Sequence, residues 1–137
     1  MDVHDKRTRS YNMSMIKGKN TKAEEIVRKY LFSQGLRYRK NVRELPGSPD
    51  IVLPKYKTVI FVNGCFWHGH QNCKYFVWPE NNAEFWRKKI TANIERDSRN
   101  KVLLEQAGWR VLVIWECELK KDSLKDSLNK LLSKIFN

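Results

Sequence analysis

The apolar residues in the first half of the chain follow a helical period and then the period of strands. Thr21-Lys22-Ala23-Glu24 matches the capping box that begins many helices, and apolar residues at helical spacing follow until Gly35. Alternating and continuous apolar stretches then predict three strands, at 36–43, 50–53 and 58–62. A turn around Pro46-Gly47 and a tight connection at 54–57 separate these strands.

The second half of the chain predicts a helix, a strand and a final helix. A long helix is expected from about Ala83 to Ala107, with Gly108 at its end. The stretch Trp109–Trp115 is the most apolar of the predicted strands, and we expect it at the centre of the sheet. Asp122 is the expected cap of an amphipathic helix within 121–137. The order α-β-β-β-α-β-α in a chain of 137 residues predicts a single α/β domain.

The composition favours a polyanionic partner. Lysine and arginine number 27 against 15 aspartates and glutamates, so the formal net charge is +12. On a small domain this surplus favours nucleic acid before an anionic membrane, and a basic protein without such a partner is the weaker alternative. No apolar run approaches the roughly 18 residues that a membrane span needs, and no secretory leader is visible. The odd number of cysteines, three, is typical of a reducing, intracellular compartment.

Residues 1–20 predict a basic arm, with the apolar Met13 among cationic residues that include Lys17 and Lys19. Such a segment is expected to lie on a partner rather than in a core. A frayed terminus is an equal alternative on composition alone.

Cysteine and histidine residues gather after the strand at 58–62. Cys65, His70 and Cys73 fall within nine positions, and Cys117 follows the apolar strand that ends at Trp115. Three cysteines and one histidine form a closed tetrahedral set of zinc ligands, the usual composition of a structural site. Two alternatives stay open: the thiols are unrelated and buried, or His68 takes the place of His70.

Three carboxylates occupy positions that call for a partner. Asp50 begins a buried strand, where it either binds a cation or accepts backbone hydrogen bonds in a turn. Glu24 already has a role in the capping box. Asp97 shares the inward face of the long helix with Asn93, so a histidine from the facing loop or a structural arginine would suit it equally.

Several motifs run in order from the arm to Cys117. They are Thr21–Glu24, Leu45–Asp50, Gly64–His70, Glu84–Trp86, Asn93–Asp97, Gly108–Leu112 and Trp115–Cys117. In this combination the chain resembles the very-short-patch-repair (Vsr) DNA mismatch endonucleases. The helix after Lys120 lies outside these motifs.

The resemblance implies a fold, an activity and a setting. The fold is that of the type II restriction-endonuclease superfamily, a mixed sheet flanked by helices, here with a structural Zn²⁺ site. The activity is a Mg²⁺-dependent, strand-specific nick 5′ to the T of a T:G mismatch, the lesion left when 5-methylcytosine deaminates. We therefore expect double-stranded DNA with a T:G mismatch as partner and no membrane. We also expect a monomer in the bacterial cytoplasm, associated with the nucleoid and in contact with other mismatch-repair proteins.

The resemblance also assigns roles to residues. Asp50 and the backbone carbonyl of Val62 would bind Mg²⁺, and His68 would be the general base. Asn63 and Asp97 would position phosphate or imidazole, and Glu24 would be an outer-shell acid. The Zn²⁺ ligands would be Cys65, His70, Cys73 and Cys117, and the DNA contacts would be Met13, Lys17, Lys19, Phe66, Trp67 and Trp86.

Two departures and two competing functions accompany the resemblance. Asn63 stands where some relatives carry histidine, and the second catalytic strand lacks the acidic-x-Lys pattern usual in the superfamily, which favours His68 as the base. One competing function is a restriction-type endonuclease of the same fold with another specificity. The other is a zinc-stabilised DNA-binding module without catalysis, which the retained Asp50 and His68 argue against.

Overall fold

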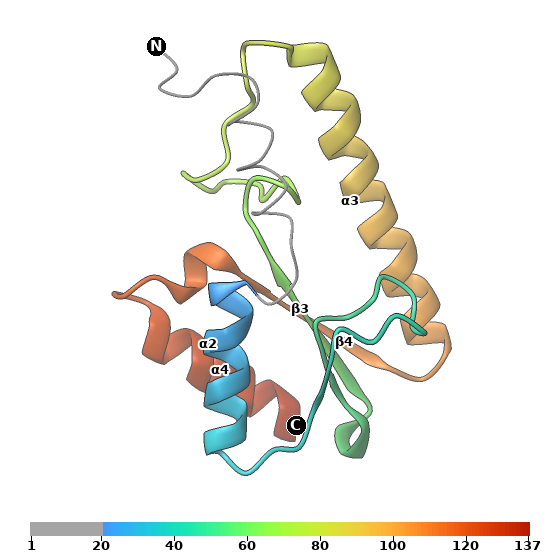
Figure 1. Cartoon of the computed structure of the whole chain (residues 1–137), viewed down its shortest axis with the longest axis vertical. Helices are drawn as coiled ribbons and strands as arrows, with labels where there is room; N and C mark the ends of the chain where they lie inside the picture. The colour runs from blue at the N-terminus through green and yellow to red at the C-terminus, as the bar shows by residue number, and fades with distance from the viewer. Residues whose placement is uncertain (1–20) are drawn as a thin grey trace.

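The computed structural model describes residues 21–137, so the predicted arm, with Met13, Lys17 and Lys19, lies outside the described residues. Helices flank one mixed sheet (Figure 1). In chain order the elements are α2 (Lys22–Ser33), β1 (Arg39–Lys40), β2 (Ile51–Leu53), η1 (Pro54–Tyr56), β3 (Thr58–Asn63), α3 (Ala83–Gln106), β4 (Arg110–Trp115), η2 (Glu116–Leu119) and α4 (Leu124–Phe136). The predicted order of helices and strands is confirmed.

The sheet has the strand order β1-β2-β3-β4. Strands β1, β2 and β3 pair antiparallel, whereas β4 runs parallel to β3, with Asn63 opposite Trp115. The prediction that Trp109–Trp115 is the central strand is wrong, because β4 is an edge of this sheet within residues 21–137. Its apolar character has another cause: Leu112 packs against one core cluster and Val111 against the other, so both faces of β4 are covered.

Two further boundaries differ from the prediction. The strand predicted at 36–43 pairs only over Arg39–Lys40, because Asn41 adopts a φ of 51° that ends the extended backbone. Helix α4 is preceded by Ser123 rather than by the predicted Asp122 cap, and no side chain caps it there. The Ser123 hydroxyl donates instead to the carbonyl oxygen of Glu118, 3.1 Å away.

Alternate residues of the strands supply the two faces of the core, as the two-residue period of a strand requires. Helices α2 and α4 cover one face, where Leu31 and Leu131 join Ile51 and Ile60 in one buried cluster. Helix α3 covers the other face, where Leu104 packs against Val52 and Val59, the sequence neighbours of Ile51 and Ile60. None of the helices formed by residues 21–137 is both long and apolar enough to cross a membrane.

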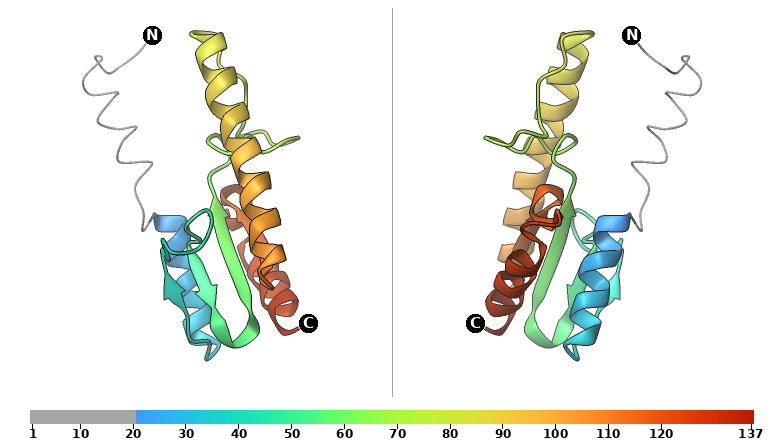
Figure 2. Two further views of the ribbon diagram at one scale, coloured as in Figure 1. Left: turned by 90° about the vertical axis from the view of Figure 1, so that its right-hand side faces the viewer. Right: turned by 90° about the vertical axis from the view of Figure 1, so that its left-hand side faces the viewer.

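Helix α3 is much longer than the sheet that it covers. Its first half extends past the sheet, and the irregular segment 64–82 rises from the end of β3 beside it (Figures 1 and 2). Asn93 connects the two, because its side-chain amide donates a hydrogen bond to the carbonyl oxygen of Trp67 at 2.9 Å. The candidate site lies where this projecting part meets the end of the sheet.

Candidate active site and metal centre

A cavity of about 700 Å³ opens where the start of α2, the end of β3, the loop after it and α3 meet. The structure brings to its wall all five side chains for which a catalytic role is predicted: Glu24, Asp50, Asn63, His68 and Asp97. These residues come from four separate parts of the sequence. The cavity wall also contains Lys89 and Arg96, two cations for which no role was predicted. A signal for them exists in the sequence, since each lies one helical turn from Asn93 on α3.

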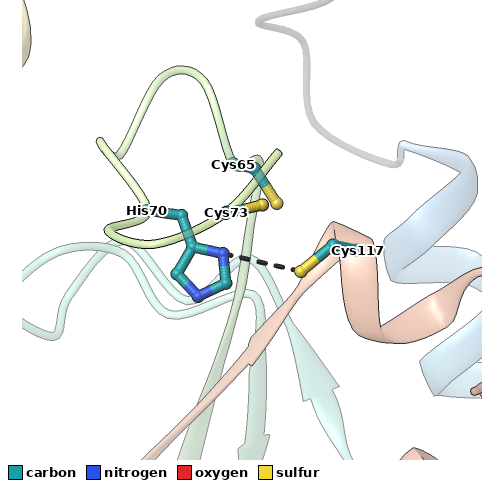
Figure 3. A group of neighbouring side chains, drawn as sticks. All are labelled: Cys65, His70, Cys73 and Cys117. Carbon is teal, nitrogen blue, oxygen red and sulfur yellow. Dashed lines mark hydrogen bonds between the residues drawn. The ribbon is translucent and has the colours of Figure 1, made fainter. Parts of the chain in front are cut away.

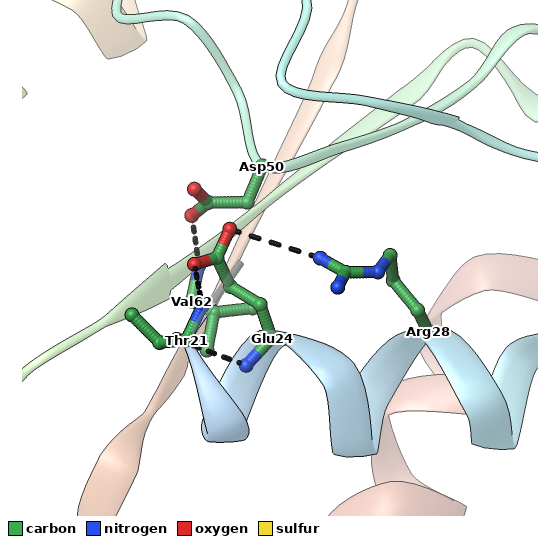
Figure 4. Close-up of polar contacts among 5 residues, drawn as sticks. All are labelled: Thr21, Glu24, Arg28, Asp50 and Val62. Carbon is green, nitrogen blue, oxygen red and sulfur yellow. Dashed lines mark hydrogen bonds and ion pairs between the residues drawn. The ribbon is translucent and has the colours of Figure 1, made fainter. Parts of the chain in front are cut away.

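Asp50 stands directly before β2 and faces the end of β3. Its Oδ2 accepts a hydrogen bond from the backbone N–H of Val62 at 2.7 Å (Figure 4). The carboxylate is therefore held in a fixed position at the edge of the cavity, which Val62 also lines. One oxygen of this carboxylate thus accepts a backbone hydrogen bond, but from strand β3 and not from a turn as the second alternative had it. The position on the cavity wall is compatible with the cation alternative.

Glu24 serves the capping box and the cavity at the same time. Its Oε2 accepts from the backbone N–H of Thr21 at 2.9 Å, and the Thr21 hydroxyl accepts from the N–H of Glu24, so the predicted capping box is confirmed. The other oxygen, Oε1, is buried and has no hydrogen-bond partner among residues 21–137. The Arg28 guanidinium forms an ion pair with this oxygen, at 3.9 Å. Figure 4 shows the Glu24 carboxylate between Arg28 and Asp50.

His68 and Asp97 form a pair across the cavity, from the loop and from α3. The Nδ1 atom of His68 lies 2.6 Å from Oδ2 of Asp97. An ionised carboxylate can only accept, so Nδ1 donates and Nε2 is left free to take up a proton. Of the two partners that the sequence allowed for Asp97, the histidine of the facing loop is the one that the structure shows.

Gly69 allows the loop to approach α3 closely. Its φ is +60°, and a Cβ atom built on it would lie 2.7 Å from Cδ1 of Ile94 and 2.9 Å from Cγ2 of Ile90. Any side chain at this position would therefore push the loop, and with it His68, away from the helix. No local sequence pattern predicts this role, because the contact joins segments far apart in the chain.

The four predicted zinc ligands lie together beside the cavity. One ligand atom from each of Cys65, His70, Cys73 and Cys117 can be chosen so that all lie within 4.8 Å of one another (Figure 3). Atoms bound to one tetrahedral zinc at about 2.0–2.3 Å are about 3.3–3.8 Å apart, so a small inward movement would complete the site. The Nδ1 atom of His70 lies 3.5 Å from Sγ of Cys117. The Cys/His group therefore contains His70 rather than His68, and His68 lines the cavity instead.

The thiols of this group differ in their electrostatics. Burial raises the pKa of the Cys65 thiol to about 12 and also raises the pKa of the Cys117 thiol. Burial acts on Cys73 in the same direction, but hydrogen bonds from the Tyr75 backbone and from the two other thiols lower its pKa overall. Adjacent thiolates repel one another, so a bound divalent cation is what would allow all three to ionise. The donor set thus fits a zinc ion.

Aromatic side chains gather at the projecting end of the molecule. The rings of Phe66, Trp67 and Trp86, three predicted DNA contacts, pack against one another with centroids 5.3–5.7 Å apart. All three are half-buried. More exposed apolar side chains lie nearby along the chain, at Val77, Trp78 and Phe85. These three predicted DNA contacts thus form one cluster.

Comparison with known proteins adds the family. Residues 1–74 match the sequence model of the DNA mismatch endonuclease Vsr family. The chain belongs to this family. It is 50% identical over 135 residues to the type II nicking enzyme V.NmeAIP of Neisseria meningitidis, covering 98% of this chain and 96% of that protein. It is 47% identical over 126 residues to the DNA mismatch endonuclease Vsr of Escherichia coli, covering 91% of this chain and 80% of that protein.

Membership of the Vsr family decides several predictions. The chain is an endodeoxyribonuclease with DNA as its substrate, and the predicted endonuclease-like mixed α/β fold is confirmed. A DNA-binding module without catalysis is therefore not the function. The similarity to V.NmeAIP extends over nearly the whole chain, so α4, which lies outside the motifs that carried the resemblance, belongs to the shared part as well.

Proposed function

We propose that this Vsr-family protein nicks one DNA strand 5′ to the T of a T:G mismatch in a Mg²⁺-dependent reaction. The observation that carries the proposal is the His68–Asp97 pair, 2.6 Å apart, which shares one cavity with Asp50. Such a cavity offers a general base and a carboxylate for a cation, the two parts that metal-dependent phosphodiester hydrolysis needs. The 47% identity to the DNA mismatch endonuclease Vsr of Escherichia coli supports the choice of substrate.

The residues at the Asp50 end of the cavity fit a magnesium ion. Mg²⁺ prefers hard oxygen ligands, which Asp50 and the Val62 carbonyl would supply, with Glu24 in the outer shell. The buried Oε1 atom of Glu24, without a hydrogen-bond partner within the described part of the chain, is the kind of oxygen that a hydrated cation would satisfy. When bound, Mg²⁺ would neutralise charge on the scissile phosphate.

His68 would take the proton from the attacking water. Asp97 accepts from Nδ1, so Nε2 is the atom that receives the proton, and the carboxylate then stabilises the resulting imidazolium. Asn63, whose amide lines the same cavity, would donate a hydrogen bond to a phosphate oxygen. Lys89 and Arg96 would add positive charge along the path of the strand.

A Zn²⁺ ion at Cys65, His70, Cys73 and Cys117 would have a structural role. Three of these ligands come from the loop that carries His68 and the inserting aromatic residues, and the fourth comes from η2 after β4. The ion would bind this loop to the end of the sheet. A site closed by four protein ligands leaves no position for water, so it would supply no chemistry.

Phe66 and Trp67 would recognise the mismatch by insertion, together with Met13 of the arm, and Trp86 would be a further DNA contact. Unstacking one base step costs a few kcal/mol and costs least at a mismatched pair, so insertion itself discriminates. The net charge of +12, with Lys17 and Lys19 among the cations, would hold the duplex through its phosphates. We infer action as a monomer at the bacterial nucleoid in the cytoplasm, and contact with other mismatch-repair proteins stays a prediction.

Labelled duplexes with T:G, G:C or A:T at one position test the proposal. Incubated with Mg²⁺, the protein should nick a single strand beside T:G alone, and Asp50→Asn and His68→Ala should abolish this nick. Asp122→Asn, at an exposed residue outside the cavity, is the matched control and should leave it intact. Cutting of both strands in matched duplexes would favour the restriction-type alternative, and full activity of Asp50→Asn would refute the metal-binding role.

A further inference from the structure

The indole of Trp115 lies between the two histidines of the loop. It stacks on the His70 ring with the centroids 3.9 Å apart and the planes 4° apart. Against His68 it makes an edge contact, with the centroids 6.4 Å apart and the planes at 75°. One side chain thus contacts the candidate zinc ligand and the candidate general base at the same time.

Trp115 is held by the sheet, whereas the histidines are carried by an irregular loop. It is the last residue of β4, pairs in register with Asn63 of β3, and donates its backbone N–H to Oε1 of Glu118 at 2.9 Å. The segment that contains His68 and His70 has no regular secondary structure of its own. Rigid support for the two rings must therefore come from a neighbouring element, and Trp115 at the end of β4 provides it.

A second cavity, of about 420 Å³, lies behind the His68–Asp97 pair and is lined by Trp115 and both histidines. Its other walls are largely apolar and include Ile94 and Val113. If the indole were removed, the His70 ring would lose its stacking partner and the His68 ring its edge contact, and the packing around them would relax only partly.

We propose that Trp115 is a positioning residue that couples the zinc site to the general base. Stacking restricts rotation of the His70 ring, which keeps Nδ1 turned towards Cys117. The edge contact restricts the His68 ring, which keeps its Nδ1 turned towards Asp97. The part of the inference that concerns the His68 ring rests on the proposed function. The part that concerns the His70 ring and zinc binding does not.

Trp115→Leu tests the coupling with three measurements on the full chain: zinc release to a competing chelator, the single-turnover rate of nicking at T:G, and the Kd for the same duplex. We expect zinc release to be about tenfold faster, at the lower end of the 10–100-fold that loss of an outer-shell partner of a metal ligand produces. The nicking rate should fall by a similar factor. The Kd for the duplex should change little, because Trp115 is not one of the proposed DNA contacts.

Two further variants separate positioning from general stability. Trp115→Phe keeps a ring that can stack and should restore most of both rates. Trp109→Leu removes an indole just before the opposite end of β4, far from the histidines, and should lower the melting temperature without changing either rate. Should Trp115→Leu fail to fold, Trp115→Met takes its place with the same expected effects, because its flexible, unbranched side chain also lacks a ring but adapts to irregular gaps.

The outcomes are distinct. Unchanged zinc release, or faster release with an unchanged nicking rate, would overturn the coupling, and so would equal effects in Trp109→Leu. Wild-type protein that does not nick T:G would refute the proposed function instead, while faster zinc release from Trp115→Leu alone would still support the contact with His70.

Discussion

Replacing Asp97 by asparagine tests the His68–Asp97 pair most directly. The amide keeps the shape of the carboxylate but removes the negative charge that stabilises an imidazolium. It also offers an N–H to Nδ1, and in that arrangement the proton of the imidazole moves to Nε2, the atom that must accept one from water. The change therefore acts on the chemical step rather than on the fold.

The geometry sets the size of the effect. At 2.6 Å the bond between Nδ1 and Oδ2 is short for a charge-assisted hydrogen bond. Loss of a bond to a charged group is worth about 1.5–3 kcal/mol, or roughly 10–150-fold in rate. Inversion of the tautomer in a comparable carboxylate–histidine pair of serine hydrolases costs about 10⁴-fold. The side chains of His68 and Asp97 are 26% and 35% exposed, so water can partly replace the lost bond, and we expect a loss of about 10²–10³-fold.

Single-turnover nicking of a T:G duplex at saturating Mg²⁺ measures this loss, with the duplex Kd measured beside it. The Kd should change little, since Asp97 would act on the base and not on the bound strand. Glu95→Gln is the matched control, because it removes one negative charge from an exposed position on the same helix. A rate loss below about threefold for Asp97→Asn, or an equal loss in Glu95→Gln, would refute the role of the pair.

Three further predictions concern stability and metal. Cys117→Ser should lose the tightly bound zinc and lower the melting temperature, and an unchanged metal content by elemental analysis would contradict the zinc site. Gly69→Ala should destabilise by about 1–3 kcal/mol in urea unfolding, because its Cβ would lie 2.7 Å from Cδ1 of Ile94. Gly35→Ala is the control, because Gly35 has a φ of +84° and a Cβ atom added there would meet no atom of residues 21–137 within 4 Å, so that this change measures the backbone cost alone. An equal loss of stability in Gly35→Ala would contradict the steric argument. Arg110→Met should lower the free energy of unfolding by about 1–3 kcal/mol, because the guanidinium donates hydrogen bonds to the carbonyl oxygens of Lys134 and Ile135 near the end of α4, at 2.6 Å and 2.8 Å. An unchanged midpoint of urea unfolding would contradict this.

Local patterns in the sequence predicted the order of the helices and strands. The capping box of α2 and the length of α3 follow from interactions within a few residues, and such interactions can be read from sequence. The face of α3 that carries Asp97 also follows from helical periodicity, and this face led to the histidine of the loop as one of two partners.

Contacts between distant segments could not be predicted in the same way. The position of β4 at the edge of the sheet depends on which strand it pairs with, whereas its apolar residues report only that both faces are covered. The choice of His70 over His68 as the candidate zinc ligand depends on how the loop turns at Gly69. The contacts of Trp115 with the His68 and His70 rings depend on the pairing of β4 and also on the turn of the loop at Gly69.

The three parts of the candidate site differ in what fixes them. Asp50 is held at the start of β2 by a bond to β3, and Asp97 lies on a helix whose later turns pack on the sheet. His68 has no such support from regular structure, so its position depends on the amide of Asn93, the close approach at Gly69 and the Cys/His group. A base displaced by 1 Å can lose most of its effect on rate. Restraint of the loop, more than the stability of the core, should therefore set the rate of the reaction.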